Sequence, residues 1–277
     1  MAVIEISNLA ALQAIALGTV DWSGDEYVLT CDIDASATQV PSYGCSPALV
    51  YDLYHPGGYI EGDFIEESGS YYYCHTATGE YPPAPGYDIN WKSYYTQTVA
   101  DPVNLALGNK AGADNEGWLP IGNSTDMFNA NFDFNGHKIT GIKMNRPSGV
   151  WAGLVGCLDG GCVVRDLELE TDLVNGMVGS AVTGGIFGNI YNGTVLNCKA
   201  SGKFTALGSY AGTVSGHAHG GKFINCVGSG NVSANDFAGG IVGKASNQQA
   251  PGCIYKCRSY CDITITNRYA GGIAGGY

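Results

Sequence analysis

Basic residues are scarce in this chain, and its first third has none. The 277 residues include 13 Lys or Arg and 25 Asp or Glu, which gives a net charge of −12. Residues 1–91 hold 13 of the acids, whereas residues 92–277 hold the other 12 acids and all 13 bases. Contacts to phosphate need clustered bases, so no nucleic-acid partner is expected. The acidic first third either serves solubility alone or offers a contact face to a basic partner or to cations.

Long apolar runs are also missing. None approaches the ~18 residues of a transmembrane helix, so we expect no membrane insertion. The first six residues have neither the basic region nor the apolar region of a secretion signal. We therefore expect either a chain that begins after a removed signal or one released by lysis, such as a virion component.

Motifs for common chemistry are absent as well. The sequence contains no nucleophile elbow, phosphate loop or dinucleotide fingerprint. It also lacks two Cys-x-x-Cys pairs, which a zinc site of the usual spacing would need. We expect no cofactor and no metal ion.

Glycine is abundant, with 42 residues, and a glycine-bracketed phrase returns five times in the second half. The five copies are Ala152-Gly-Leu-Val-Gly156, Gly184-Gly-Ile-Phe-Gly188, Gly212-Thr-Val-Ser-Gly216, Gly239-Gly-Ile-Val-Gly243 and Gly271-Gly-Ile-Ala-Gly275. Their closing glycines are 32, 28, 27 and 32 residues apart. A period in this range predicts stacked units, each too small to bury its own apolar face.

Matching residues recur at fixed places in each period. One set is Leu167, Cys198, Cys226 and Cys257; a second is Val150, Val182, Tyr210, Phe237 and Tyr269; a third is Phe204, Val232 and Ile263. Each unit offers about three short β-prone runs separated by turn residues, without helical periodicity. We predict an all-β fold, a coiled parallel β-solenoid in which matching residues stack about 4.8 Å apart. The first two sets are predicted to form two internal edges of one core.

The glycine phrase resembles the GLUG motif of large bacterial surface and secreted proteins, which include adhesin-like proteins and some immunoglobulin A peptidases. Upstream segments extend the resemblance, namely Leu9–Ile15, Tyr27–Asp34, Trp118–Gly122 and Phe132–Ile142. It covers about residues 4–34 and 118–277, and implies a right-handed parallel β-helix. No catalytic residue belongs to the motif.

The N-terminal segment predicts a short helix that covers one end of the solenoid. Ser7 can cap it, its apolar stripe is Leu9, Leu12, Ile15 and Ala16, and Gly18 can end it. The predicted organisation is therefore a cap helix and first strand (1–34), an insertion (35–117) and the repeat region (118–277).

The insertion lacks the repeat phrase and contains 11 of the 18 tyrosines. Tyrosine supplies a flat apolar ring with a hydroxyl, which suits protein contacts and stacking on sugars. The candidate binding residues are Tyr71, Tyr72, Tyr73, Trp91, Tyr94 and Tyr95. The alternative is that these rings pack an irregular subdomain onto the solenoid.

The ten cysteines fall into two groups. Those of the repeat ladder, Cys198, Cys226 and Cys257, are predicted to be buried free thiols. A disulfide between Cys45 and Cys74 is possible in the insertion. The alternative pairs are Cys157 with Cys162, and Cys253 with Cys257 or Cys261.

Two polar clusters allow a catalytic hypothesis. Asp166, Glu168, Glu170 and Asp172 alternate with apolar residues, so we expect them on the outer face of one strand, with neighbours about 6.5–7 Å apart. An inverting carboxylate pair needs a similar separation. His217 and His219 follow a glycine phrase, either as two imidazoles on one side of a turn or as a solvated corner.

These observations lead to three hypotheses. The favoured one is a non-enzymatic extracellular, cell-surface or virion module, such as a phage tail appendage, that presents the Tyr-rich insertion to a glycan or protein. The second is a self-assembling filament subunit, because the fifth glycine phrase at 271–275 begins a repeat that the sequence does not finish. The third is a β-helical polysaccharide lyase or hydrolase.

Overall fold

The computed structural model describes residues 3–17, 22, 25–39, 50–51, 64–67, 70–74, 91–95, 117–147, 151–246 and 254–276. Within the strands of residues 50–95 it describes the backbone. The chain divides into two compact units. The first comprises Met1–Gln39 and Trp118–Tyr277, and the second comprises Val40–Gly117.

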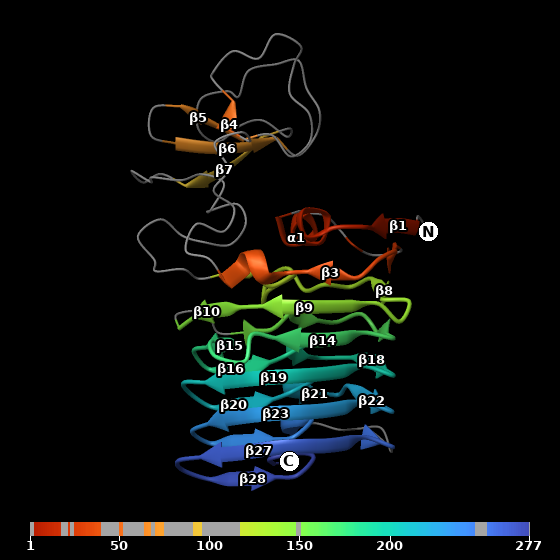
Figure 1. Ribbon diagram of the computed structural model, residues 1–277, viewed down its shortest axis with the longest axis vertical. Helices are drawn as coiled ribbons and strands as arrows, with labels where there is room; N and C mark the ends of the chain where they lie inside the picture. The colour runs from red at the N-terminus through yellow and green to blue at the C-terminus, as the bar shows by residue number, and fades with distance from the viewer. Residues whose placement is uncertain are drawn as a thin grey trace. The chain divides into compact units, whose positions relative to one another are not determined.

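The first unit is a solenoid built from four parallel sheets, numbered here in the order in which the chain visits them (Figure 1). Sheet 1 contains β1 (Val3–Ile6), β2 (Glu26–Leu29), β8 (Asn131–Asp133), β13 (Cys162–Arg165), β18 (Gly193–Leu196), β22 (Lys222–Ile224) and β26 (Ile254–Tyr255). Sheet 2 contains β3 (Ile33–Asp34), β9 (Lys138–Ile142), β10 (Met144–Arg146), β14 (Glu168–Thr171), β15 (Met177–Gly179), β19 (Lys199–Ala206), β23 (Val227–Ala234) and β27 (Arg258–Ile265).

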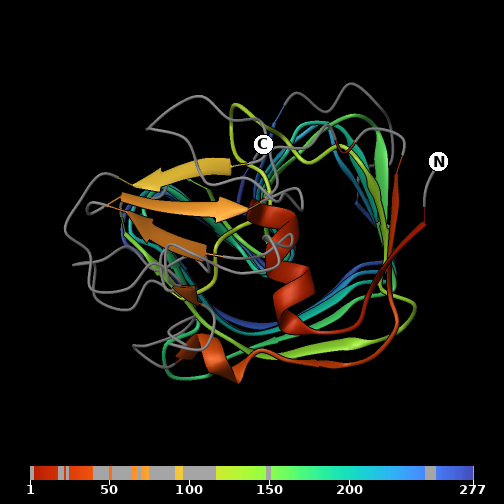
Figure 2. The same cartoon turned by 90° about the horizontal axis from the view of Figure 1, so that it is seen from above.

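The two smaller sheets complete each coil. Sheet 3 contains β11 (Trp151–Ala152), β16 (Val182–Gly184), β20 (Tyr210–Gly212), β24 (Phe237–Gly239) and β28 (Tyr269–Gly271). Sheet 4 contains β12 (Val155–Leu158), β17 (Phe187–Ile190), β21 (Ser215–His219) and β25 (Val242–Ser246). Seen from above, the strands of successive coils superpose (Figure 2). The predicted parallel β-solenoid is confirmed.

A short helix, α1 (Leu9–Leu17), lies over the first coil (Figure 1). Leu12 and Ile15 are buried, as the predicted stripe requires. The cap is Asn8 rather than Ser7, because the Asn8 side-chain oxygen accepts a hydrogen bond from the Ala11 backbone N–H at 2.8 Å. Buried Gln13 fastens the helix to the next pass of the chain: its amide donates to the Leu119 carbonyl at 3.0 Å and accepts from the Leu119 N–H at 3.2 Å.

The glycine phrases form the corners between sheets 3 and 4. A Cβ on Gly184 would overlap the carbonyl oxygen of Phe187 and lie 2.7 Å from the backbone nitrogen of Gly216 in the next coil. A Cβ on Gly216 would in turn lie 2.8 Å from the backbone of Thr183 in the preceding coil. The bracketing glycines are therefore needed because backbone packs on backbone there.

The variable repeat length also has a local cause. Strand β19 pairs along its first part with β14 and along its last part with β15. Between β14 and β15 the chain makes an extra turn, and Leu173 and Val174 on this turn are exposed. The first period of 32 residues thus differs from the next, of 28, mainly by a turn in sheet 2, and the glycine corners are unchanged.

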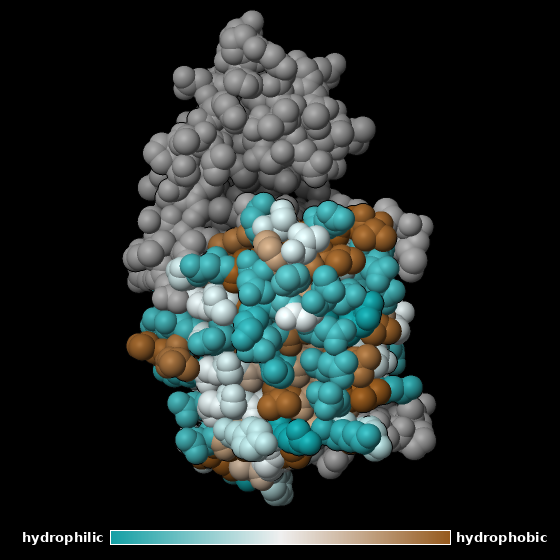
Figure 3. Space-filling model, turned by 45° about the vertical axis from the view of Figure 1, so that its right-hand side comes forward, coloured by the Kyte–Doolittle hydropathy of each residue, from teal (hydrophilic) through white to brown (hydrophobic). Residues whose placement is uncertain are grey.

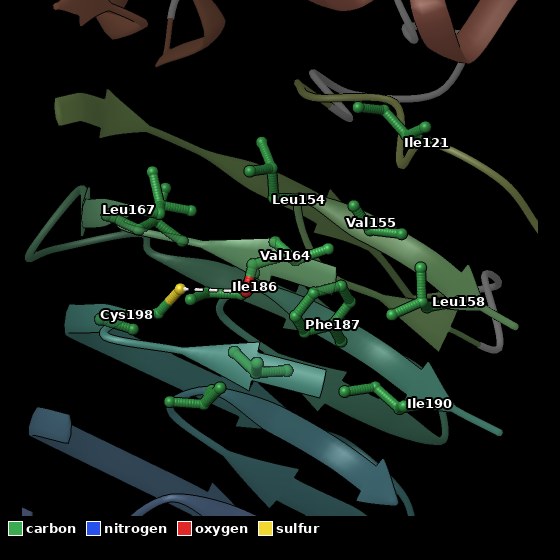
Figure 4. Packing of buried hydrophobic residues seen from close by; sticks show 14 of the residues in the cluster. Ile121, Leu154, Val155, Leu158, Val164, Leu167, Ile186, Phe187, Ile190 and Cys198 are labelled. Atoms are coloured by element: carbon green, nitrogen blue, oxygen red, sulfur yellow. Dashed lines mark hydrogen bonds between the residues drawn. The ribbon is translucent and has the colours of Figure 1, made fainter. Parts of the chain in front are cut away.

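The predicted cysteine ladder lies at the corner between sheets 1 and 2. Leu167, Cys198 and Cys226 are buried and Cys257 is half-buried. The strands that follow these positions pair in register, Glu168 with Lys199, Lys199 with Val227, and Val227 with Arg258. Figure 4 shows Leu167 and Cys198 among the buried residues of successive coils. The third set is also in register, as Phe204 pairs with Val232 and Val232 with Ile263.

The second predicted ladder has the expected register but faces the other way. Val182, Tyr210, Phe237 and Tyr269 pair in succession along sheet 3. Val150 lies outside the described residues, and Trp151 is the residue paired with Val182. Ala211 and Ala238 belong to the central apolar cluster, whereas Val182 and Phe237 are buried outside it. Since a strand alternates its faces, the small residues point inward and the large ones outward.

The second unit contains a four-stranded sheet that the irregular-looking sequence did not predict. Its strands are β4 (Val50–Tyr51), β5 (Phe64–Glu67), β6 (Ser70–Cys74) and β7 (Trp91–Tyr95). Strand β4 is parallel to β5, and β5, β6 and β7 are antiparallel neighbours.

Candidate functional site

All six predicted binding residues lie on two neighbouring strands, β6 and β7. Across this pair Tyr71 is opposite Tyr95, Tyr72 opposite Ser93, Tyr73 opposite Lys92, and Cys74 opposite Trp91. The register shifts between Tyr71 and Tyr72, at the level of Tyr94. On the other side, β5 places Glu66 opposite Tyr71 and Ile65 opposite Tyr72. The backbone therefore gathers these aromatic residues on adjacent strands. Cys45 lies outside the described residues, so its disulfide with Cys74 stays a prediction.

A second group of functional side chains lies along the boundary of sheets 3 and 4, on the outer side of the solenoid. We call it the seam and define it as Tyr210 and Phe237 from sheet 3, with Asn189, His217 and Lys244 from sheet 4. The three sheet 4 residues pair in succession on β17, β21 and β25. The Tyr210 and His217 rings have centroids 5.4 Å apart, so the two columns are in contact.

His217 and His219 both lie in β21, and neither occupies a turn or a solvated corner. Their ring centroids are 6.0 Å apart. His217 Nε2 lies 2.7 Å from Ser246 Oγ, and His219 Nδ1 lies 3.3 Å from the same oxygen. His217 and His219 thus lie on the same side of β21, and the Ser246 hydroxyl lies within hydrogen-bonding distance of both imidazoles.

The seam keeps His217 uncharged at neutral pH. Burial, together with the nearby charges of His219 and Lys244, lowers the pKa of this imidazole to about 4. The Lys244 ammonium stacks over the rings of Tyr210 at 5.1 Å and Phe237 at 5.2 Å. Its Nζ also lies 3.5 Å from the Tyr210 hydroxyl. The local positive potential disfavours a bound cation.

Polar atoms without partners lie deep in the seam. Asn189 is 1% exposed, and neither its amide nitrogen nor its amide oxygen has a hydrogen-bond partner. His217 Nδ1, on the next strand, is also unpaired. Within the described ranges no group of three or more His, Cys, Asp or Glu side chains could hold a metal ion. The seam thus offers a neutral imidazole, a hydroxyl and an amide, which are hydrogen-bonding groups.

The four acids do not share one strand face. Only Glu168 and Glu170 lie within β14. Asp166 occupies the preceding corner with a positive φ of 60°, and Asp172 accepts hydrogen bonds from the backbone N–H groups of Val174 and Asn175 in the following turn. Asp172 thus stabilises the turn after β14, and Asp166 accepts a hydrogen bond from the side chain of Asn197 in the next coil.

Glu168 is held as a carboxylate. Its oxygens lie 2.7 Å from Lys138 Nζ and 3.3 Å from Lys199 Nζ, and the two lysines lower its pKa, Lys138 more strongly. A general acid in glycoside hydrolysis needs a raised pKa, so this geometry does not favour Glu168 in that role.

A ladder of polar residues runs beside the cysteine ladder, and the repeat spacing alone did not predict it. Asp166, Asn197, Asn225 and Lys256 each precede a member of the cysteine ladder and have φ between 54° and 60°. Asn197 donates to Asp166 and Asn225 donates to Asn197, both at 2.9 Å. Asn and Asp tolerate the left-handed conformation better than most residues. The recurring Asn-Cys dipeptide was the available signal.

The ladder cysteines are free thiols, as predicted. Cys157, Cys162, Cys257 and Cys261 are also free, so the alternative disulfides involving them are wrong. Their placement explains this: Cys157 is buried on the outer side of sheet 4, whereas Cys162 lies in sheet 1.

Comparison with known proteins gives two relatives. The chain is 33% identical over 100 residues to a protein described as a Gly-rich membrane protein of Evansella cellulosilytica, a match over 36% of this chain and 11% of that protein. It is 28% identical over 250 residues to halomucin of Haloquadratum walsbyi, a match over 78% of this chain and 2% of halomucin. This chain thus spans a small part of either relative. No family model matches it. No solved structure matches it either.

Among the described residues, no helix is long and apolar enough to cross a bilayer. On the solenoid face turned toward the viewer in Figure 3, hydrophilic side chains cover most of the surface.

Proposed function

We propose that this chain is a structural and adhesive module of an extracellular or cell-surface protein. The solenoid serves as the rigid scaffold, and the Tyr-rich sheet of β5, β6 and β7 binds a glycan, with a protein ligand as the alternative. The observation that supports binding most directly is the register of β6 and β7, which places Tyr71 opposite Tyr95 and Trp91 opposite Cys74. Aromatic residues on adjacent strands can present an extended apolar surface to sugar rings.

Two further observations support the surface location. The relatives are named as a membrane protein and a halomucin, and each is far longer than this chain. The resemblance to the GLUG motif is consistent with a module in a large bacterial surface protein. A repetitive scaffold that contacts only its neighbouring coils suits such proteins, because its length can vary without a new fold.

The proposal is for a non-enzymatic module. Its support is local: Glu168 is paired with two lysines on the strand where a carboxylate pair was considered. Glu170 is exposed beside it, with Thr140 and Ser201 as its neighbours in register. The two lysines lower the pKa of Glu168, whereas a general acid needs a raised pKa.

The test is a glycan array probed with the full chain and with a double variant, Tyr71→Ser with Tyr95→Ser. We expect at least a tenfold loss of affinity, because the variant removes a cross-strand aromatic pair. Tyr260→Ser is the matched control, since Tyr260 is an exposed tyrosine on β27 of the solenoid, and it should bind as the parent does.

Equal losses in the double variant and the control would contradict the assignment to β6 and β7. An array without any bound glycan would favour the protein ligand. A reducing-sugar release assay addresses catalysis: release that disappears with Glu168→Gln or Glu170→Gln would replace the non-enzymatic proposal with a polysaccharide-cleaving one.

A further inference from the structure

Two cysteines stack on each other in successive coils of the solenoid. Cys226 and Cys257 occupy the same corner between sheets 1 and 2. The residues on either side of them pair in register, Ile224 with Tyr255 and Val227 with Arg258. Neighbouring parallel strands are about 4.8 Å apart, which lies within the Cα separation of roughly 4.4–6.8 Å that a disulfide requires. The fold therefore holds the Cα atoms of the two cysteines at a separation that a disulfide can bridge.

The Cys257 sulfur lies against the backbone of Cys226. The Cys226 backbone N–H donates a hydrogen bond to this sulfur at 3.4 Å, and the Cys226 thiol donates to the carbonyl oxygens of Ile224 at 3.5 Å and Val195 at 3.6 Å. The proximity of the two cysteines lowers the pKa of Cys257 to about 7, and the same proximity together with burial raises the pKa of Cys226. Cys257 is half-buried and Cys226 is fully buried. One thiol is accessible and readily ionised, and its neutral neighbour lies behind it.

The third cysteine of the ladder differs from Cys257 in its exposure. Cys198 is fully buried, and its thiol donates to the carbonyl oxygens of Leu196 at 3.3 Å and Val164 at 3.9 Å. Burial raises its pKa to about 12. It can therefore serve as an internal control, because it shares the column with Cys226 but has no accessible thiolate.

We propose that Cys257 and Cys226 form a redox-active dithiol that hydrogen peroxide oxidises to a disulfide linking two adjacent coils. In the first step the Cys257 thiolate attacks one peroxide oxygen, the O–O bond breaks, and the departing oxygen takes up a proton to leave as water. The sulfenic acid of Cys257 remains. The Cys226 sulfur then attacks the Cys257 sulfur, and the S–S bond forms as the S–O bond breaks. The hydroxyl of the sulfenic acid leaves as a second water with the Cys226 proton. Overall, two thiols and one peroxide give one disulfide and two waters.

The oxidised protein gains a covalent link between coils that are otherwise held by backbone hydrogen bonds and apolar packing. The link closes the chain between Cys226 and Cys257, which spans one complete turn of the solenoid. The last coil should then separate from the preceding one less readily, and the midpoint of thermal unfolding should rise on oxidation.

The experiment uses the full chain, reduced and then exposed to stoichiometric hydrogen peroxide. Intact mass and peptide mapping should show the loss of two hydrogens and a cross-link between the peptides containing Cys226 and Cys257. Cys198→Ser should give the same cross-link, whereas Cys226→Ser and Cys257→Ser should not. Cys226→Ser should instead accumulate the sulfenic acid of Cys257, detected with a dimedone probe.

Circular dichroism of each reduced variant establishes that it is folded before oxidation, so failure to fold is distinguished from failure to react. Three results would overturn the proposal: a bridge between Cys198 and Cys226, oxidation of Cys257 to sulfinic acid in the parent without any cross-link, or thiols that all stay reduced in folded protein.

Discussion

A buried imidazole connects the seam to the pH of its surroundings. His217 is packed against Tyr210 and lies near Lys244, and its Nδ1 has no hydrogen-bond partner. Its pKa falls from 6.5 to about 4 on folding. Between pH 6.5 and pH 4 the unfolded chain therefore binds a proton at His217 that the folded chain does not bind. The free energy of unfolding therefore decreases as pH falls through this window.

We expect His217 to leave the midpoint of urea unfolding unchanged between pH 8 and 7. From pH 6.5 to 4 its contribution should lower the midpoint progressively. The variant His217→Gln should lose this part of the pH dependence, because it has no ionisable ring. Ser246→Ala is the control, since it removes the hydroxyl but retains the buried imidazole, and it should keep the dependence. Parallel curves for the parent and His217→Gln would contradict the prediction.

At the scale of single residues, the sequence predicted which residues stack in successive coils better than it predicted the contacts of their side chains. The ladder cysteines followed from their spacing, because matching places in a repeat must stack. The hydrogen bond from the Cys226 backbone N–H to the Cys257 sulfur could not be predicted from the spacing, since it depends on the direction of the Cys257 side chain at the corner. The burial of Asn189 was equally invisible, because an asparagine between Gly188 and Ile190 gives no sign of which neighbours cover it.

The glycine corner is the element on which the fold depends most. A Cβ on Gly212 would overlap the carbonyl oxygen of Ser215 and lie 2.7 Å from the nitrogen of Gly243 in the next coil. Both obstacles are backbone atoms of neighbouring strands, so they cannot move aside as a side chain would.

We expect Gly212→Ala to lower the free energy of unfolding by about 2 kcal/mol or more, since overpacking against a backbone must displace a strand. Gly272→Ala is the matched control. It changes the second glycine of the last phrase, where an added Cβ would meet nothing within 4 Å. Chemical denaturation of both variants measures the difference, and equal stability would show that the corner can open.

The elements also show where pattern reading fails. Val182, Tyr210 and Phe237 were expected inside the solenoid because large apolar residues at a repeated position usually form a core. The inner face of sheet 3 instead carries Thr183, Ala211 and Ala238, which are small and fully buried. The small residue that follows each large one, Ala211 after Tyr210 and Ala238 after Phe237, indicates which face of the strand points inward.

For the whole molecule, the two ends of the insertion meet the same residue of the solenoid. The Thr38 hydroxyl accepts a hydrogen bond from the Lys143 N–H at 2.8 Å, and the Trp118 N–H donates to the Lys143 carbonyl at 2.9 Å. Residues 38 and 118 are therefore close in space although 80 residues separate them in the sequence.

We expect a chain in which a short Gly-Ser linker replaces residues 40–117 to fold as a solenoid. Its circular dichroism should retain the β-sheet spectrum, and its unfolding should be cooperative, because the first unit contains its own core. The same chain should lose the glycan binding proposed for β6 and β7. An unfolded product would show that the solenoid needs the second unit.

The architecture was predictable at this scale and the insertion was not. Five glycine phrases determine a repeated coil, since each copy restates the same corner. The strands of residues 50–95 have no such repetition, and their clustered tyrosines and prolines give no alternation that distinguishes strand from loop.

The contacts between glycines of successive coils have a consequence for how such a chain can change over generations. Each corner fits the one before it and the one after it, and all the corners are nearly alike. A gene segment encoding one whole coil can therefore be duplicated or lost, and the flanking coils will meet surfaces that already match. A substitution at one corner, by contrast, must be accepted by two coils at once. Descent should lengthen or shorten this protein more readily than it alters its glycines.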